Sequence, residues 1–335
     1  MQKLLSYLAC PICGGTLKQG ERLECLSGCG SYPVESGVPR LLPELCRKEE
    51  AAEEYQDGTR RSFGTQWKMF QYGGTTWGIR VEERVPVVLH ELNWSESDLS
   101  GKVILDAGCG NGTLSAALAG RGATVLALDL SDSVFRAKEH CSTPGVHFIQ
   151  GNLFFPPLKR GIFDAIYSCG VFHHTPDTKR CFDALVPTLK NSVEAKYFIW
   201  LYSQRSRLFN ATVQQAMKVT RRMPSSLLVP LCFTLSPLVE GASRLLTALR
   251  VVEYAPRTLR DRAIQLHDLL SPAFVHYHSF EEAAKWARSA GFKEVRRTSY
   301  EAAGRQGEIL QKYRRVCRPG FGMLCYGRNG PRSGS

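Results

Sequence analysis

Four cysteines near the start of the sequence have the spacing of a metal site. Cys10 and Cys13 lie in CPICGG, and Cys25 and Cys29 lie in CLSGCG, which gives the pattern C-x2-C-x11-C-x3-C. Two such pairs can meet on one tetrahedral ion, and zinc suits four thiolates. An iron centre and four buried free thiols are the alternatives. The spacing therefore predicts a structural zinc site, with no open coordination position for chemistry.

The glycine-rich segment VILDAGCGNG is a second candidate site. An apolar run leads to Asp106 and is followed by Gly108, Gly110 and Gly112, where the missing side chains allow a ligand to approach the backbone closely. The G-x-G-x-G spacing differs from the G-x-G-x-x-G of nicotinamide dinucleotide sites. Asp129 ends the next apolar run, about twenty residues later, where doubly wound folds bind a ribose.

These segments resemble the motifs of class I S-adenosylmethionine-dependent methyltransferases over residues 99–202. The resemblance implies that Asp129 accepts hydrogen bonds from both ribose hydroxyls. Asn152, in FIQGNLF, stands where the family usually has an acid that accepts from the adenine amino group, and its amide oxygen can still accept. The segment FDAIYSCGVFHHTPD matches the fourth motif, which faces the methyl group. The cofactor-binding residues implied in this way are Asp106, Gly108, Cys109, Gly110, Gly112, Asp129, Leu130, Asn152, Leu153 and Ser168.

His173 and His174 are the candidate catalytic residues. They replace the N/D-P-P-Y/F sequence that is common in nitrogen-directed methyltransferases, and they resemble the double histidine of small-molecule oxygen and carbon methyltransferases, including sugar O-methyltransferases. An unperturbed imidazole, with a pKa near 6.5, can take the proton from an attacking hydroxyl. We expect methyl transfer to oxygen or carbon of a small-molecule, sugar or lipid-like acceptor. Packing beside the cofactor is the alternative role for either histidine.

The N-terminal segment LACPICGGTL, followed by YPVESGVPRLLP, resembles the small zinc-ribbon activator of tRNA and protein methyltransferases. It is also similar to ribbons fused ahead of bacterial methyltransferases, including a ribosomal-RNA guanine methyltransferase. An RNA methyltransferase that uses the ribbon and a basic C-terminal half for recognition is therefore the alternative function. A noncatalytic scaffold that binds cofactor, or a protein partner through the ribbon, is a second alternative.

Two further segments, FGTQW with the later Trp77-Gly78 and DLLSPAFVHYHSFEE, resemble parts of a largely uncharacterised bacterial group of methyltransferases. Their aromatic residues are candidates for the lining of the substrate pocket, with ordinary core packing as the alternative. These residues are Trp67, Trp77, Tyr277 and His278.

The elements that position these residues follow from hydrophobic patterning. Five short apolar runs alternate with amphipathic stretches, which predicts an α/β fold with a doubly wound, mostly parallel sheet; the resemblance implies seven strands. The runs are KVILDAG, TVLALDL, VHFIQGN, FDAIYSCG and KYFIWLY, with GFKEVRRTSY as a later strand. The predicted division is a zinc ribbon at 1–45, a linker and N-terminal lid or collar at 46–98, a cofactor-binding core at 99–205, a helical cap insertion at 206–270, the C-terminal part of the catalytic domain at 271–325 and a disordered tail at 326–335.

Composition and charge limit the partners. The 335 residues carry a net charge of +12, and residues 201–335 hold 22 Lys and Arg against 9 Asp and Glu. This basic part suits a solvated surface, nucleic acid, anionic headgroups or a phosphorylated acceptor. The apolar run at 227–239 is too short to span a bilayer, so we expect at most peripheral membrane contact. The absence of a leader pattern and the paired cysteines predict a cytoplasmic protein.

Overall fold

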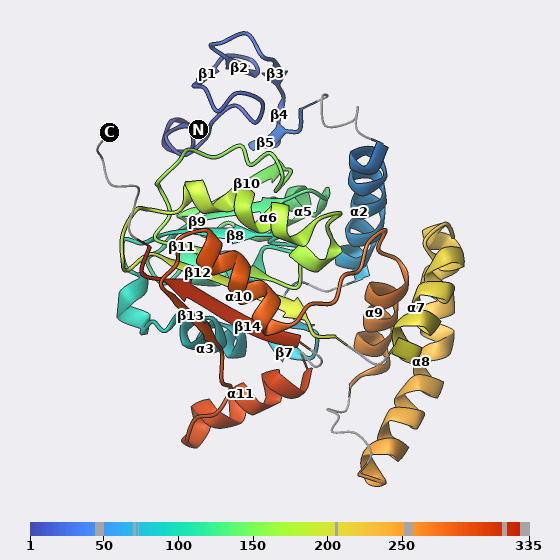
Figure 1. Cartoon of the computed structure of the whole chain (residues 1–335). Helices are drawn as coiled ribbons and strands as arrows, with labels where there is room; N and C mark the ends of the chain where they lie inside the picture. Colours follow the sequence, from blue (N-terminus) through green and yellow to red (C-terminus); the bar gives the residue numbers. More distant parts are fainter. Residues whose placement is uncertain are drawn as a thin grey trace.

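The computed structural model of the chain describes residues 1–43, 50–69, 72, 74–204, 207–250, 257–316 and 320–328. A nine-stranded sheet forms its centre (Figure 1). In spatial order the strands are β13 (Glu294–Arg297), β14 (Gly320–Tyr326), β12 (Lys196–Tyr202), β11 (Ala165–Cys169), β8 (Val103–Ala107), β9 (Thr124–Asp129), β10 (Val146–Gly151), β5 (Val38–Leu41) and β4 (Val34–Glu35). The seven strands from β13 to β10 confirm the predicted sheet, and β5 and β4 extend it.

The five predicted apolar runs become the parallel centre of the sheet. Strands β10, β9, β8, β11 and β12 pair in parallel, and β14 is antiparallel to both β12 and β13. The register sets Asp106 opposite Ala127 and opposite Tyr167. Because the carboxyl ends of parallel strands lie at one edge, the loops after β8, β9, β10 and β11 meet there.

Helices cover both faces of the sheet. Ile104 lies in a buried cluster with residues of α3, α4 and α5, whereas the next residue, Leu105, lies in a cluster with α6 and α10. This alternation is the period-two pattern of a strand that is buried on both faces. The helices are α3 (Val81–Leu92), α4 (Thr113–Ala119), α5 (Ser133–His140), α6 (Thr178–Leu185), α10 (Phe280–Ser289) and α11 (Gly304–Val316), with short 3-10 turns η2 (Glu96–Leu99), η3 (Phe172–His174) and η4 (Val186–Thr188) and the hairpin β6 (Thr75–Thr76)–β7 (Ile79–Arg80).

The N-terminal unit shares its core with the sheet. It consists of α1 (Gln2–Leu5), a small sheet of β1 (Leu17–Gln19), β2 (Leu23–Cys25) and β3 (Ser31–Tyr32), and the β4–β5 hairpin. β5 pairs in parallel with β10, and the Ala9 amide donates to the Pro157 carbonyl over 3.1 Å. Leu8 and Leu23 belong to the same buried cluster as Leu105. Residues 34–41, which the predicted division places in the ribbon at 1–45, thus form two strands of the central sheet.

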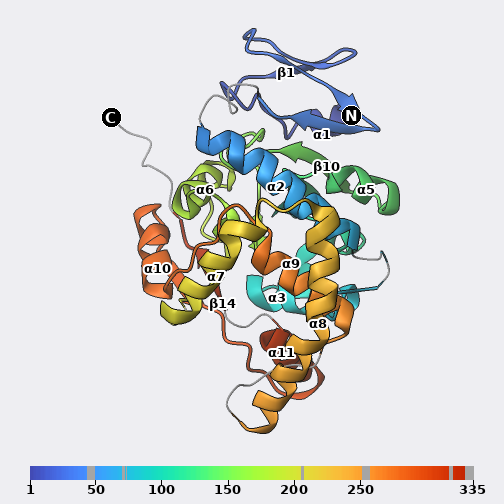
Figure 2. The same cartoon turned by 90° about the vertical axis from the view of Figure 1, so that its right-hand side faces the viewer.

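A third group of helices flanks the sheet at one side, where Figure 2 shows it facing the viewer. It contains α2 (Glu50–Met69), α7 (Arg207–Thr220), α8 (Ser225–Ala248) and α9 (Leu259–Leu270). Much of the predicted linker therefore lies within a 20-residue helix. The apolar run at 227–239 is only part of the 24-residue α8. By length and composition alone this longer helix could cross a membrane, which the run by itself could not.

The C-terminal part of the chain contains a capped helix and the last strand of the sheet. The Ser279 side chain accepts a hydrogen bond from the Glu282 amide at the start of α10, and Gly291 after the helix has φ +91°. β14 continues to Tyr326, one residue into the predicted tail, and the Gly327 amide donates to the Val193 carbonyl. Residues 329–335, together with Cys46 and Cys317, lie outside the described residues.

The shared core makes a prediction about stability. Leu8 is fully buried at the junction of the N-terminal unit and the sheet, so Leu8→Ala should lower the free energy of unfolding of the whole chain by about 2–5 kcal/mol. Urea unfolding followed by tryptophan fluorescence measures this. Val193→Ala, at a side chain that is 59% exposed, is the control and should change it by less than about 0.5 kcal/mol. A Leu8→Ala variant as stable as the control would mean that the two parts unfold independently.

Candidate functional site

The turn after β8 is built from glycines that no other residue can replace without displacing a neighbour. Gly108, Gly110 and Gly112 have φ values of +88°, +56° and +69°, which favour glycine. A Cβ on Gly108 would lie 2.3 Å from the Val171 side chain, and one on Gly110 would lie 2.2 Å from the indole of Trp67. The predicted ligand loop therefore exists, and its backbone is closely covered by two other segments.

Two carboxylates flank this loop. Asp106 is buried and accepts a hydrogen bond from the Ser115 hydroxyl over 2.5 Å. Asp129 accepts from the Gly110 amide over 2.9 Å and from the Ser131 amide and hydroxyl. Burial, together with the nearby charge of Asp129, raises the pKa of Asp106 to about 6, and burial also raises the pKa of Asp129. A ligand that carries positive charge and donates hydroxyl hydrogen bonds would stabilise both, which fits the sulfonium, ammonium and ribose groups of S-adenosylmethionine.

The other predicted cofactor residues surround the loop at different depths. The Ser168 hydroxyl donates to the Ala107 carbonyl over 2.8 Å and so ties β11 to the end of β8. Asn152 is buried, and its side-chain oxygen accepts from the Phe154 amide over 2.9 Å. Leu130, Leu153 and Cys109 are buried. The structure brings all the predicted cofactor-binding residues to one edge of the sheet. Ser168 and Asn152 form hydrogen bonds with backbone atoms there.

A cavity of about 510 Å³ lies between α2 and the start of α5, next to the loop that follows Asp129. Its volume is typical of small-molecule sites. Trp67 lines it and also contacts Gly110, so the cavity adjoins the glycine loop. The lining residues are Arg60, Arg61, Gly64, Thr65, Trp67, Lys68, Tyr72, Asp132, Ser133 and Arg136.

His173 and His174 lie in η3, three residues or fewer after the Val171 that contacts Gly108. His174 Nδ1 is 3.2 Å from the Phe274 carbonyl oxygen. Since a carbonyl can only accept, Nδ1 carries the proton and Nε2 keeps its lone pair. Burial lowers the pKa of both histidines, that of His173 most strongly. His174 is thus a neutral, oriented base at neutral pH.

His173 is enclosed among aromatic rings. It is fully buried, its ring lies 4.0 Å from the ring of Tyr202, and it meets Trp200 edge-on at 5.8 Å. Neither ring nitrogen has a hydrogen-bond partner among the described residues. Buried polar atoms are rarely left so, and a ligand or water in this space would satisfy them.

A polar network from α2 and α9 borders the histidines and was not singled out from the sequence. Asp268 accepts hydrogen bonds from the Tyr202 hydroxyl over 2.8 Å and from the Gln66 amide over 3.2 Å. The negative charge of Asp268 raises the pKa of His174, but burial lowers this pKa by more. Gln66 and Asp268 lie in the segments FGTQW and DLLSPAFVHYHSFEE, whose aromatic residues were predicted to line the pocket. The polar residues of the same segments could therefore have been found from the sequence.

The predicted pocket aromatics separate in space. Trp67 lies at the glycine loop, and the Tyr277 ring stacks on Tyr202 with centroids 5.9 Å apart. Trp77 instead packs against a cluster formed by α3, α11 and β7. His278 bonds Thr178 and Glu282 through its two ring nitrogens, which ties α10 to α6. Trp67 and Tyr277 therefore belong to the site region, whereas Trp77 and His278 have structural contacts.

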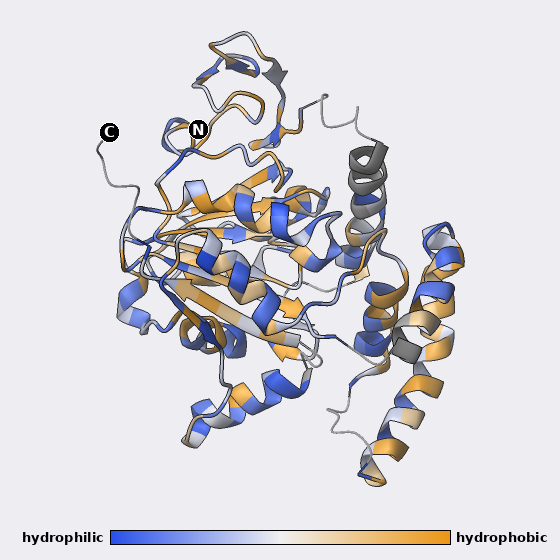
Figure 3. Cartoon of the chain, in the orientation of Figure 1, coloured by the Kyte–Doolittle hydropathy of each residue, from blue (hydrophilic) through white to orange (hydrophobic). Residues whose placement is uncertain are grey.

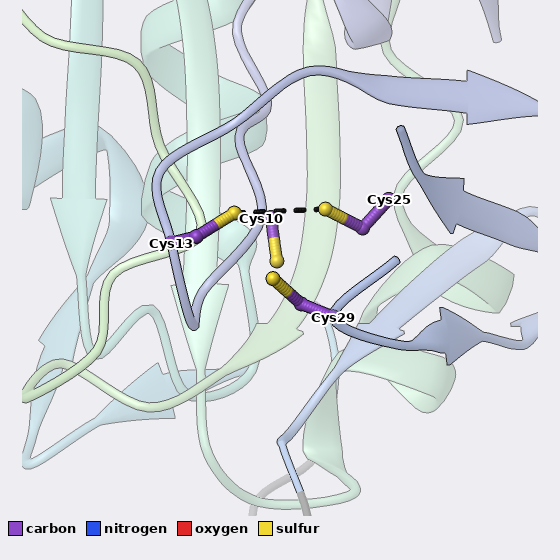
Figure 4. Close-up of side chains that lie close together, drawn as sticks. All are labelled: Cys10, Cys13, Cys25 and Cys29. Carbon is purple, nitrogen blue, oxygen red and sulfur yellow. Dashed lines mark hydrogen bonds between the residues drawn. The ribbon is translucent and has the colours of Figure 1, made fainter. Parts of the chain in front are cut away.

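The four N-terminal cysteines converge. The sulfur atoms of Cys10, Cys13, Cys25 and Cys29 all lie within 4.8 Å of one another, and Figure 4 shows them pointing toward a common centre. The Gly15 amide donates to Cys13 Sγ over 3.3 Å. Backbone amides of Cys29 and Ser27 lower the pKa of Cys25 to about 6, which favours the thiolate form that binds metals. This donor set fits a tetrahedral zinc ion.

Part of the chain is similar in sequence to known methyltransferases. Residues 105–193 match a family model described as "Methyltransferase domain". The chain is 33% identical over 147 residues to the ubiquinone biosynthesis O-methyltransferase of Xylella fastidiosa, covering 41% of this chain and 59% of that protein. It is 36% identical over 112 residues to the enzyme of the same name from Azotobacter vinelandii, covering 30% and 47%. The chain thus spans about half the length of these relatives.

Solved structures resemble the chain more distantly. A Haemonchus contortus phosphoethanolamine N-methyltransferase matches with a TM-score of 0.49 and 12% identity over 82% of this chain and 60% of that one. The magnesium protoporphyrin IX methyltransferase of Synechocystis matches with a TM-score of 0.45 and 14% identity over 82% and 98%. At these scores the assignment depends on the family match and on the strand order. The match to a methyltransferase domain covers residues 105–193, which hold the glycine loop and the ends of β8 to β11.

Proposed function

We propose that the protein is an S-adenosylmethionine-dependent methyltransferase that methylates an oxygen of a small, largely apolar acceptor. The observation that carries this proposal is the meeting, at one sheet edge, of the glycine loop, its two carboxylates and the neutral His174. When bound, the cofactor supplies a methyl group activated by a sulfonium. Asp129 would hold the ribose, and Asp106 would offset positive charge.

The acceptor follows from the surroundings of the histidines. The rings of Phe63, Tyr202 and His173 surround His174, with Phe63 at 5.2 Å and Tyr202 at 5.7 Å. Such a wall suits an aromatic or lipid-like molecule with few charges. The names of the curated relatives support a hydroxylated small molecule over RNA. His174 Nε2 would take the hydroxyl proton while α2 and α9 exclude water and hold the acceptor in line.

Zinc and a cytoplasmic location are further parts of the proposal. The sulfur cluster supports structural zinc, and the described cysteines, all free, suit a reducing compartment. A likeness of this unit to the methyltransferase activator stays a prediction, as does a protein partner for it.

Cofactor binding is the first test. Asp129→Ala removes the carboxylate proposed to accept from the ribose and should weaken S-adenosylmethionine binding by at least about 100-fold, because hydrogen bonds to a charged group contribute about 1.5–3 kcal/mol each. Titration calorimetry measures it. Asp183→Asn, at an exposed carboxylate on α6, should bind like the unchanged protein. No binding by folded, zinc-containing protein would favour the scaffold function instead.

The assignment of the base makes a second prediction. His174→Gln should lower kcat by about 10²–10⁴-fold while leaving cofactor binding intact. Because burial lowers the pKa of His174 below its usual 6.5, the base stays neutral as pH falls, and kcat should decline only below that value. A pH profile of single turnovers measures this. His173→Gln is the matched variant, and a larger loss of rate there would exchange the two roles.

The metal makes a third prediction. Purified protein should contain about one zinc ion per chain, and Cys13→Ser should lose it. Since the ribbon shares the sheet's core, zinc loss should lower the unfolding temperature of the whole chain in calorimetry. Cys141→Ser keeps all four sulfur atoms and is the control. Unchanged melting after chelation would contradict a structural role.

A further inference from the structure

The outer face of α8 is apolar and uncovered. Figure 3 shows hydrophobic residues along this helix at the edge of the molecule. Six large side chains on it, and at its C-cap, are between 40% and 71% exposed: Leu227, Phe233, Leu238, Leu245, Leu246 and Leu249. Only 22% of the most apolar 18-residue window is buried. Several exposed large apolar side chains gathered on one helix indicate a place of interaction.

The inner face of α8 is fixed to α9. Leu228 and Cys232 are buried against Ala263, and Glu240 forms an ion pair with Arg262 over 3.1 Å. Both charged side chains are only 6% exposed. Moving α8 across a bilayer would separate this pair and leave the carboxylate in hydrocarbon, at large cost. Contact through the outer face alone leaves the pair intact.

Two backbone carbonyls of α8 accept hydrogen bonds from hydroxyls of the same helix. Pro237 has no amide hydrogen to donate to the Phe233 carbonyl, and the Ser236 hydroxyl donates to that carbonyl over 2.8 Å instead. The hydroxyl of the exposed Thr234 donates to the Pro230 carbonyl over 3.0 Å. An apolar medium could therefore cover this face at little cost in lost hydrogen bonds with water.

The charges around this face have one sign. Between residues 207 and 250 the sequence has six Lys and Arg but only one acid, the buried Glu240. Arg221 and Arg222 are exposed just before α8, and Arg250 is exposed just after it. A second copy of the chain packed here would bring these cations together, whereas anionic headgroups would pair with them.

We propose that the outer face of α8 docks on the surface of an anionic lipid bilayer, with the leucines in the interfacial region and the flanking arginines on headgroup phosphates. The helix lies along the interface and does not span it. This inference holds whether or not the chain transfers methyl groups.

Vesicle sedimentation with the full-length protein tests the docking. The protein should bind vesicles of phosphatidylcholine and phosphatidylglycerol, bind pure phosphatidylcholine weakly, and be released by salt. Leu238→Ser with Leu245→Ser should weaken binding by at least about tenfold, from the lost apolar burial. Arg221→Gln with Arg222→Gln should weaken it by roughly fivefold per arginine. Val193→Ser, at an exposed apolar residue far from α8 in sequence, should bind normally.

Three results would overturn the proposal. One is no vesicle binding, or equal binding by all variants. The second is protein that resists both salt and alkaline extraction, which would indicate a spanning helix. The third is a dimer in light scattering that the leucine changes convert to a monomer without any vesicle binding, which would assign the face to a second copy. Urea unfolding of each variant, followed by tryptophan fluorescence, checks that the fold is intact.

Discussion

Three positions after β8 have no room for a side chain, and the site is arranged around that constraint. Gly108 contacts Val171, which leads into the turn that carries both histidines. Gly110 contacts Trp67 of α2, and Gly112 contacts Phe148 of β10, the strand that ends just before Asn152. The loop is therefore a junction where the η3 turn, α2 and β10 are held in register with one another.

The second constraint is the continuous core beneath the N-terminal unit. A ribbon with so few residues cannot bury enough apolar surface alone, and metal commonly supplies much of the folding energy of such units. Here β5 also lengthens the catalytic sheet, and Leu23 packs in the same cluster as Leu105. The sulfur cluster and the stability of the sheet are thus linked through shared packing.

The sequence predicted what local pattern controls. Five apolar runs gave the parallel strands, glycine spacing gave the ligand loop, and cysteine spacing gave the sulfur cluster. It could not predict pairings made by very short segments: β4 has two residues, and β5 joins β10 more than 100 positions away. It also missed which face of α8 would stay exposed, because a helix that is apolar on all sides shows no preferred face. The hydrogen bonds of Asp268 were not predicted because its partners, Gln66 and Tyr202, are distant in sequence.

The two halves of the site differ in electrostatic character: one holds buried carboxylates and the other holds neutral histidines. The proposed proton transfer runs toward the histidines. On the cofactor side, Asp106 and Asp129 have raised pKa values that a cation would relieve. On the acceptor side, burial keeps His173 and His174 neutral, so an uncharged acceptor enters without desolvating a charge. If His174 takes a proton as proposed, the charge of Asp268 and the Phe274 carbonyl would both stabilise the charged ring. The Asp268 carboxylate already accepts two hydrogen bonds and so is held in place. Under the proposed mechanism Asp268 would therefore be a positioning residue that stabilises the protonated base, held by Gln66 of α2 and Tyr202 of β12.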